Sequence, residues 1–78
     1  MTDKAAPEAL AIGAELRRRR EAAKLSQAEL GRRIGVVAQQ VSKYESGADR
    51  ISCVALARAA RALACRAGDF FPDELEPA

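Results

Sequence analysis

Residues 25–47, LSQAELGRRIGVVAQQVSKYESG, carry the signals of two short helices joined by a tight turn. Ser26 and Glu29 match the capping box, a pattern in which each side chain accepts a hydrogen bond from the backbone N–H of the other residue. Gly35 follows at the position where the C-terminus of a helix favours a left-handed residue. We therefore predict a capped helix over 26–34 that ends in a glycine turn.

The next helix, predicted over 37–46, separates its apolar from its polar side chains. At about 100° per residue, one side holds the apolar residues Val37, Val41 and Tyr44. The opposite side holds the polar residues Gln39, Ser42, Lys43 and Ser46. Gly47 can close this helix as well. A capped helix, a glycine turn and a second helix with one polar face form the helix-turn-helix arrangement.

The remaining sequence also favours helices, because it is rich in Ala and its β-branched residues are scattered. The further helices that we predict cover residues 9–23, 53–63 and 67–71, and Pro72 ends the last of them. The predicted fold is therefore all-α, a compact bundle of five short helices. The helix-turn-helix is formed by the second and third of these helices.

The charge of the chain is concentrated in its middle. The net charge is +2, but residues 11–50 carry nine basic and five acidic groups, and both ends of the chain are net acidic. A basic segment suggests a polyanion as partner, although an ordinary solvated helix face has the same composition. We predict one domain over 9–72, between a flexible N-terminal tail, 1–8, and an acidic C-terminal tail, 73–78.

The composition argues against catalysis and against metal binding. The chain contains no His, the commonest general base and the commonest metal ligand. Cys53 and Cys65 are 12 positions apart, and 12 residues of helix span about 18 Å. A disulfide requires Cα atoms within about 7 Å of each other. We therefore predict two reduced, buried thiols, no metal, no cofactor and no enzyme activity.

The sequence shows no membrane-spanning or secretion signal. No apolar run approaches the roughly 20 residues that a spanning helix needs. The N-terminal sequence MTDKAAPEAL lacks the apolar region of a signal peptide. We therefore expect a cytoplasmic location and no membrane partner.

These features together resemble one family of DNA-binding domains. The stretch from Ile12 to Phe71 is similar to the lambda-repressor/Cro-like helix-turn-helix family, often called XRE-type, as found in single-domain bacterial regulators. The matching residues are Leu16, Arg20, Leu25–Leu30, Ile34–Val36, Val41–Gly47, Leu56, Ala60, Leu63 and Phe70. The resemblance implies a nucleoid-associated, sequence-specific transcriptional regulator of the repressor or controller type. It also implies a homodimer on a palindromic operator of double-stranded DNA, with the helix over 37–46 in the major groove.

The resemblance assigns base reading to that helix. The matched positions are Ala38, Gln39 and Lys43, flanked by Gln40 and Ser42. Gln39 can pair bidentately with adenine, Lys43 can donate to guanine, and the Ala38 methyl can touch a thymine methyl. The competing interpretation of these residues is an exposed polar helix face.

Other matched positions hold the DNA backbone or the fold. The predicted backbone contacts are Ser26, Gln27, Ser46 and Arg50. Arg20 and Glu45 match a structural ion pair of the family, and an unpaired carboxylate beside the apolar side of a helix is costly. Val37 departs from the family, which has Ser or Thr there as the helix cap. Losing such a cap costs about 0.5–2 kcal/mol.

The partners of the domain follow from the same resemblance. Family members often pair near their C-terminal end, where this chain has the apolar residues Leu63, Phe70, Phe71 and Leu75. The alternative function is an antitoxin, which uses the same domain to bind a toxin and to regulate its own operon. We expect no small-molecule effector, because no second domain is evident to hold one.

Overall fold

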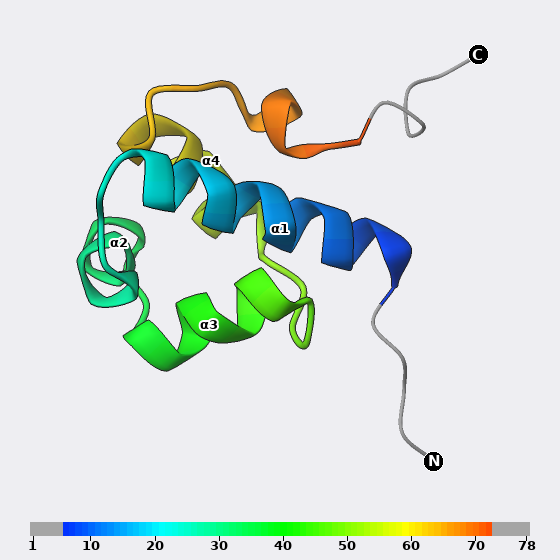
Figure 1. Ribbon diagram of the computed structural model, residues 1–78, viewed down its shortest axis with the longest axis horizontal. Helices are drawn as coiled ribbons and strands as arrows, with labels where there is room; N and C mark the ends of the chain where they lie inside the picture. Colours follow the sequence, from blue (N-terminus) through cyan, green and yellow to red (C-terminus); the bar gives the residue numbers. More distant parts are fainter. Residues whose placement is uncertain (1–5, 73–78) are drawn as a thin grey trace.

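The computed structural model describes residues 6–72, which form four α-helices followed by one short 3-10 helix (Figure 1). The α-helices are α1 (Pro7–Ala22), α2 (Gln27–Ile34), α3 (Ala38–Ser46) and α4 (Cys53–Ala62), and the 3-10 helix is η1 (Ala67–Phe70). No strand occurs within this described range. The prediction of an all-α fold is therefore confirmed.

The predicted fifth α-helix over 67–71 is wrong, because the structure has only the four-residue 3-10 turn η1 in its place. Gly68 is a poor helix former. Pro72 disfavours helical backbone at the residue before it, and Phe71 accordingly has a ψ of 139°. The turn nevertheless places Phe70 in the core, where it is 1% exposed.

The predicted tails fall mostly outside the described residues. Residues 1–5 and 73–78 are not described. At the N-terminal end α1 begins at Pro7, before the predicted start at residue 9. Proline suits the first position of a helix, because its fixed φ is already helical and the missing N–H has no partner there anyway.

The core lies where α1, the helix-turn-helix pair and α4 meet. In Figure 1, α1 crosses the molecule with α3 on one side of it and the 3-10 turn on the other, and α2 contacts both α3 and α4. The buried apolar residues are Leu16, Leu30, Ile34, Val41, Tyr44, Ala55, Leu56, Ala59, Ala60 and Phe70. This single cluster includes residues of every described helix, so each helix helps to position the others.

The two cysteines are free thiols, as predicted, but neither is fully buried. Cys53 is exposed because it is the first residue of α4, and the buried face of that helix begins at Ala55. Cys65 is half-buried beyond the C-terminus of α4, and desolvation raises the pKa of its thiol above the ordinary value.

The caps of the helix-turn-helix pair form as predicted. The Ser26 hydroxyl accepts from the Glu29 backbone N–H at 3.0 Å, and the Glu29 carboxylate accepts from the Ser26 N–H at 2.8 Å. These hydrogen bonds lower the pKa of Glu29 below its ordinary value. Gly35 and Gly47 close α2 and α3 with φ angles of 82° and 79°. Local chemistry therefore fixes where α2 begins and where both helices end.

Gly13 allows α1 to approach α3 closely, a contact for which the sequence alone gives no signal. A Cβ atom at this position would lie 2.2 Å from the backbone oxygen of Tyr44 and 2.8 Å from that of Glu45. Glycine in a helix interior costs about 1 kcal/mol relative to Ala. Here it lets the C-terminal turn of α3 rest directly on the backbone of α1.

Candidate nucleic-acid interface

One face of α3 is polar and open to solvent. Gln39, Ser42 and Lys43 are exposed, whereas Val41 and Tyr44 on the opposite face are buried in the core. The structure therefore places the three polar side chains together on the free side of a helix whose other side is anchored. Such a helix can present hydrogen-bond donors and acceptors to a ligand without changing its angle to the domain.

The first turn of α3 carries apolar rather than capping groups. Val37 is the N-cap residue, makes no side-chain cap and is 69% exposed. Ala38 follows and is half-buried. An exposed valine at the start of a polar helix face costs the helix a hydrogen bond and offers methyl groups to whatever the face contacts.

Two predicted contact residues are bonded within the chain instead of being free. The Gln40 amide nitrogen donates to the Asp49 carboxylate at 3.0 Å, which ties α3 to the loop that follows it. The Ser46 hydroxyl donates to the Lys43 carbonyl at 3.2 Å and accepts from the Ala48 N–H at 3.3 Å. Both side chains therefore hold α3 against the loop that follows it, and the Gln40 amide oxygen has no partner within residues 6–72.

The structure brings Arg20 and Glu45 together in a buried, bidentate ion pair. Arg20 Nε and Nη2 donate to the Glu45 carboxylate oxygens at 2.6 Å and 3.1 Å, and Arg20 Nη1 donates to the Leu25 carbonyl at 2.8 Å. Only 4% of the Glu45 side chain is exposed. The hydrogen bonds to Glu45 raise the pKa of Arg20 above its ordinary value. The pair fastens the end of α3 to the end of α1.

Gln27 connects a third helix, α2, to the Arg20–Glu45 ion pair. Its amide nitrogen donates to Glu45 Oε1 at 3.0 Å, so the first residue of α2 is bonded to α3. The sequence predicts a DNA-backbone contact for Gln27 and contains no sign of this bond to Glu45. A separation of 18 residues gives no local signal by which a single sequence could reveal it. The side-chain amide oxygen of Gln27 has no hydrogen-bond partner within residues 6–72.

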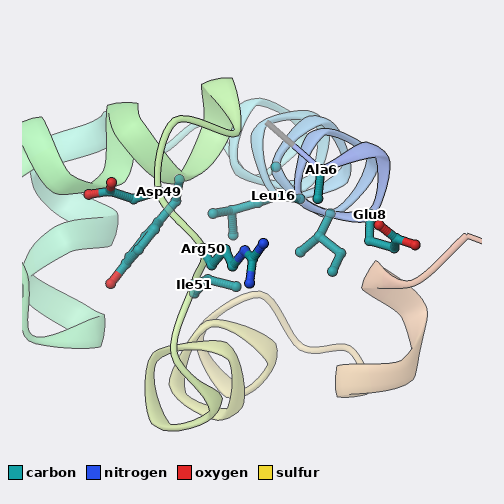
Figure 2. Close-up of a pocket in the computed structure, with 10 residues that line it drawn as sticks. Ala6, Glu8, Leu16, Asp49, Arg50 and Ile51 are labelled. Carbon is teal, nitrogen blue, oxygen red and sulfur yellow. The ribbon is translucent and has the colours of Figure 1, made fainter. Parts of the chain in front are cut away.

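Arg50 and Ser26 are the other residues predicted to contact the DNA backbone, and they differ in whether their side chains are already hydrogen-bonded within the chain. Arg50 extends from the loop between α3 and α4 and is exposed. Its side chain lines a groove beside α1 (Figure 2). The Ser26 hydroxyl accepts the cap bond of α2 but retains its proton for a further acceptor.

The residues predicted to form the dimer interface differ in how far they are buried. Phe70 belongs to the chain's own core, Leu63 is half-buried, and Phe71 is 43% exposed. Leu75 lies outside the described residues. The exposed aromatic surface at this end of the domain is therefore that of Phe71.

Two negative findings hold for residues 6–72. In this range no three His, Cys, Asp or Glu side chains gather in a way that could hold a metal ion. No helix in the same range is both long and apolar enough to cross a membrane.

A capped helix, a glycine turn and a second helix with a free polar face define a helix-turn-helix domain. Residues 11–69 match the family described as "Helix-turn-helix domain". This match covers most of the chain, and the chain therefore belongs to that family.

Named relatives and solved structures agree with this assignment. The chain is 48% identical over 62 residues to an "uncharacterized transcriptional regulator in ATPase CF(0) region" of Rhodospirillum rubrum, covering 80% of this chain and 57% of that protein. It spans about half the length of the curated relatives that it matches.

Two solved structures are similar over nearly their whole length. The restriction-modification controller protein C.AhdI from Aeromonas hydrophila has a TM-score of 0.75 and 31% identity, covering 80% of this chain and 94% of that one. The P22 c2 repressor, solved in complex with synthetic operator 9T, has a TM-score of 0.73 and 28% identity, covering 77% and 91%.

Proposed function

We propose that this chain is a sequence-specific, double-stranded DNA-binding transcriptional regulator of the repressor or controller type, with α3 as its reading helix in the major groove. The observation that carries the proposal is the exposed polar face of α3, formed by Gln39, Ser42 and Lys43 opposite a buried apolar face. The similarity to a repressor solved with its operator and to a controller protein supports the same function.

The chemistry of this face suits base reading. The major groove, about 12 Å wide, admits one α-helix and displays a different donor and acceptor pattern for each base pair. Gln39 offers a donor and an acceptor on one amide, which matches adenine, and Lys43 offers donors, which match guanine. The exposed methyl groups of Val37 suit a thymine methyl at the start of the helix.

Rigidity of the reading helix supports specificity as well. The Glu45 carboxylate is held by Arg20 and by Gln27, so α3 keeps its angle to both α1 and α2. Ser46 is the last residue of α3 and Arg50 lies just beyond it, where contacts to the DNA backbone would set the register of the helix. Such contacts position the domain without reading sequence.

The same proposal includes a homodimer on a palindromic operator and no enzymatic activity. A single DNA-binding module of this size covers only about 600–1,000 Å² of DNA-facing surface. Two copies on half-sites about 34 Å apart double the number of base contacts. The exposed ring of Phe71 lies at the end of the domain where we place the second copy. The expected location is the nucleoid in the cytoplasm.

The test is to select bound duplexes from a random pool, derive the consensus, and measure the affinity of variants for consensus and random duplexes. Lys43→Ala is expected to lose about 1–3 kcal/mol on the consensus and to relax the preference at one base pair. Arg61→Ala, which removes an exposed cation from α4, is the control and should leave that preference unchanged. Equal weakening on consensus and random duplexes would show that Lys43 does not read bases.

A further inference from the structure

A groove of about 310 Å³ opens between the first half of α1 and the loop that joins α3 to α4 (Figure 2). Its walls are mainly apolar, and the half-buried side chains of Ile12 on α1 and Ile51 in the loop supply aliphatic surface from both sides. The volume is at the lower end of the range of about 300–1,000 Å³ found for small-molecule sites. The space therefore fits one ring or one short branched chain.

Three charged residues line the groove, Glu8, Asp49 and Arg50, and of these only Arg50 directs its charge into it. Figure 2 shows the Arg50 guanidinium extending into the space between α1 and the loop, while the carboxylates of Glu8 and Asp49 point away from it. Asp49 is engaged by the Gln40 amide on the α3 side. Within residues 6–72, no carboxylate forms an ion pair with Arg50.

We propose that this groove binds a small apolar monocarboxylate, such as an aryl or branched-alkyl acid. The ring or alkyl chain would lie against the aliphatic walls, and the carboxylate would accept two hydrogen bonds from the Arg50 guanidinium. Guanidinium and carboxylate groups match in this bidentate geometry, and the bonds are stronger than those between neutral groups. The site lies inside the helical domain, so it needs no second domain to hold an effector.

The ligand would also regulate DNA binding, a step that rests on the proposed function. Arg50 is the exposed cation that we place at the DNA backbone. A carboxylate bound to its guanidinium neutralises that charge and occupies the donors that a phosphate would use. The ligand is therefore expected to weaken DNA binding, and DNA must weaken ligand binding by the same factor.

The binding test uses phenylacetate as the probe and the ¹⁵N-labelled full chain in nuclear magnetic resonance titrations without DNA. Saturable shifts are expected at the amides of Ile12, Arg50 and Ile51. Uncharged 2-phenylethanol and ringless acetate should each bind about tenfold more weakly, since each lacks one of the two interactions. Arg50→Gln should weaken phenylacetate about tenfold. The matched control Arg61→Gln removes an arginine from a separate hollow between α2 and α4 and should change nothing.

Three results would overturn the site. The first is equal binding of acetate and phenylacetate, which would reduce the effect to a general anion contact. The second is a shift pattern centred on Arg58 and Arg61, which would place the ligand in the other hollow. The third is binding that occurs only after deletion of residues 1–5, which would make the chain's own N-terminal segment the occupant.

A separate titration tests the coupling, with consensus duplex in the presence and absence of saturating phenylacetate. A severalfold loss of DNA affinity is expected. Unchanged DNA affinity would refute the proposal that the ligand regulates DNA binding, but it would leave the proposal of a binding site in the groove intact. Failure of the chain to bind any duplex, with intact phenylacetate binding, would refute the proposed function and leave the site in place.

Discussion

At the residue scale, Glu45 is the group on which three helices converge. Its carboxylate accepts hydrogen bonds from Arg20 of α1 and Gln27 of α2, and both of its oxygens are engaged. Burying a charge is costly, and the cost is offset only while its partners stay in place. The orientation of α3 therefore depends on one carboxylate that never contacts a ligand in our proposal.

Removing one partner of this pair is expected to destabilise the domain strongly. Arg20→Met leaves the Glu45 charge buried without its main partner, a change that typically costs about 3–5 kcal/mol. The double variant Arg20→Met with Glu45→Met should recover much of this loss, because two apolar side chains carry no buried charge. Urea unfolding of both variants measures the difference, and a single variant within 0.5 kcal/mol of wild type would contradict the role of the pair.

Glu29 makes the stability that the capping box contributes depend on pH. The sign of this dependence follows from the direction in which folding shifts the pKa of Glu29. Hydrogen bonds from Ser26 lower the pKa of Glu29 in the folded chain. Its contribution to stability is therefore present above the unfolded pKa, about 4.3, and is lost as the pH falls through the lower folded value.

The prediction is that Glu29→Ala lowers the melting temperature at pH 7 and that the gap to wild type narrows towards pH 2–3 (about two units below the unfolded pKa). Glu29→Gln is the control, because its amide oxygen can still accept from the Ser26 N–H and does not titrate. Melting curves at both pH values measure the gap for each variant. A gap for Glu29→Ala that does not change with pH would assign the effect of Glu29 to packing instead of charge.

At the scale of elements, the crossing of α1 and α3 is set by the missing side chain of Gly13. Its Cα lies against the backbone oxygens of Tyr44 and Glu45, and backbone cannot move aside as a flexible side chain can. The helices must separate if any Cβ is added at this position. The same end of α3 carries the Glu45 ion pair, so a shift there disturbs both contacts.

Gly13→Ala should therefore destabilise the domain, although Ala is the better helix former by about 1 kcal/mol. Overpacking of this kind costs about 1–3 kcal/mol, or more where backbone must move. Gly68→Ala is a matched control, since an added Cβ there meets no atom within 4 Å. Thermal unfolding of the two variants compares them directly. Equal stability of both variants would show that the close approach of α3 at Gly13 does not limit the stability of the domain.

The elements that the sequence predicts well are those defined by local chemistry. Ser26 with Glu29 and the two closing glycines Gly35 and Gly47 act within one turn, and all form as expected. The predicted fifth helix is wrong for a local reason, because Gly68 is a poor helix former and Pro72 forces extended backbone at Phe71, so that only the 3-10 turn η1 forms. The close contact at Gly13 could not be predicted, because only the backbone of the partner helix α3 shows why glycine is needed there.

In the candidate interface, too, features set by local periodicity are predictable from sequence, and features set by long-range hydrogen bonds are not. Helical periodicity alone separates Gln39 and Lys43 from the buried face of α3, and the structure has that separation. Gln27 and Gln40 look like free polar residues in sequence, but each donates to a carboxylate 18 or 9 residues away. Long-range pairing of this kind leaves no periodic trace, so a pattern of spacing cannot distinguish a bracing amide from a binding one.

At the scale of the whole molecule, every arginine in the run Arg17–Arg20 of α1 pairs with a carboxylate, and three carboxylates serve the four guanidiniums. Arg17 pairs with Glu21, Arg18 and Arg19 pair with Glu15, and Arg20 pairs with Glu45. The four guanidiniums also point in different directions around the helix, since successive residues are about 100° apart. The basic middle of the chain is therefore not one patch. Lys43 on α3 and Arg50 in the loop after it are exposed, and they are the two cations that our proposal places at the DNA.

This distribution predicts a selective effect on the salt dependence of DNA binding. Each phosphate contact releases counterions and contributes about −0.9 to the slope of log K against log salt concentration. Arg50→Gln should reduce the slope by about 0.9 for each protomer bound, because it removes one such contact. The control Arg17→Gln should leave the slope unchanged, since Arg17 lies on α1 and is already paired with Glu21.

Fluorescence anisotropy with the consensus duplex across a range of salt concentrations measures both slopes, and sedimentation of the same complexes counts the protomers. Two protomers on one duplex predict a total change of about 1.8 for Arg50→Gln, whereas one protomer predicts about 0.9. The slope and the stoichiometry must agree, because each bound copy brings its own Arg50. Equal changes for Arg17→Gln and Arg50→Gln would mean that α1 faces the DNA, and the orientation proposed for α3 would then be wrong.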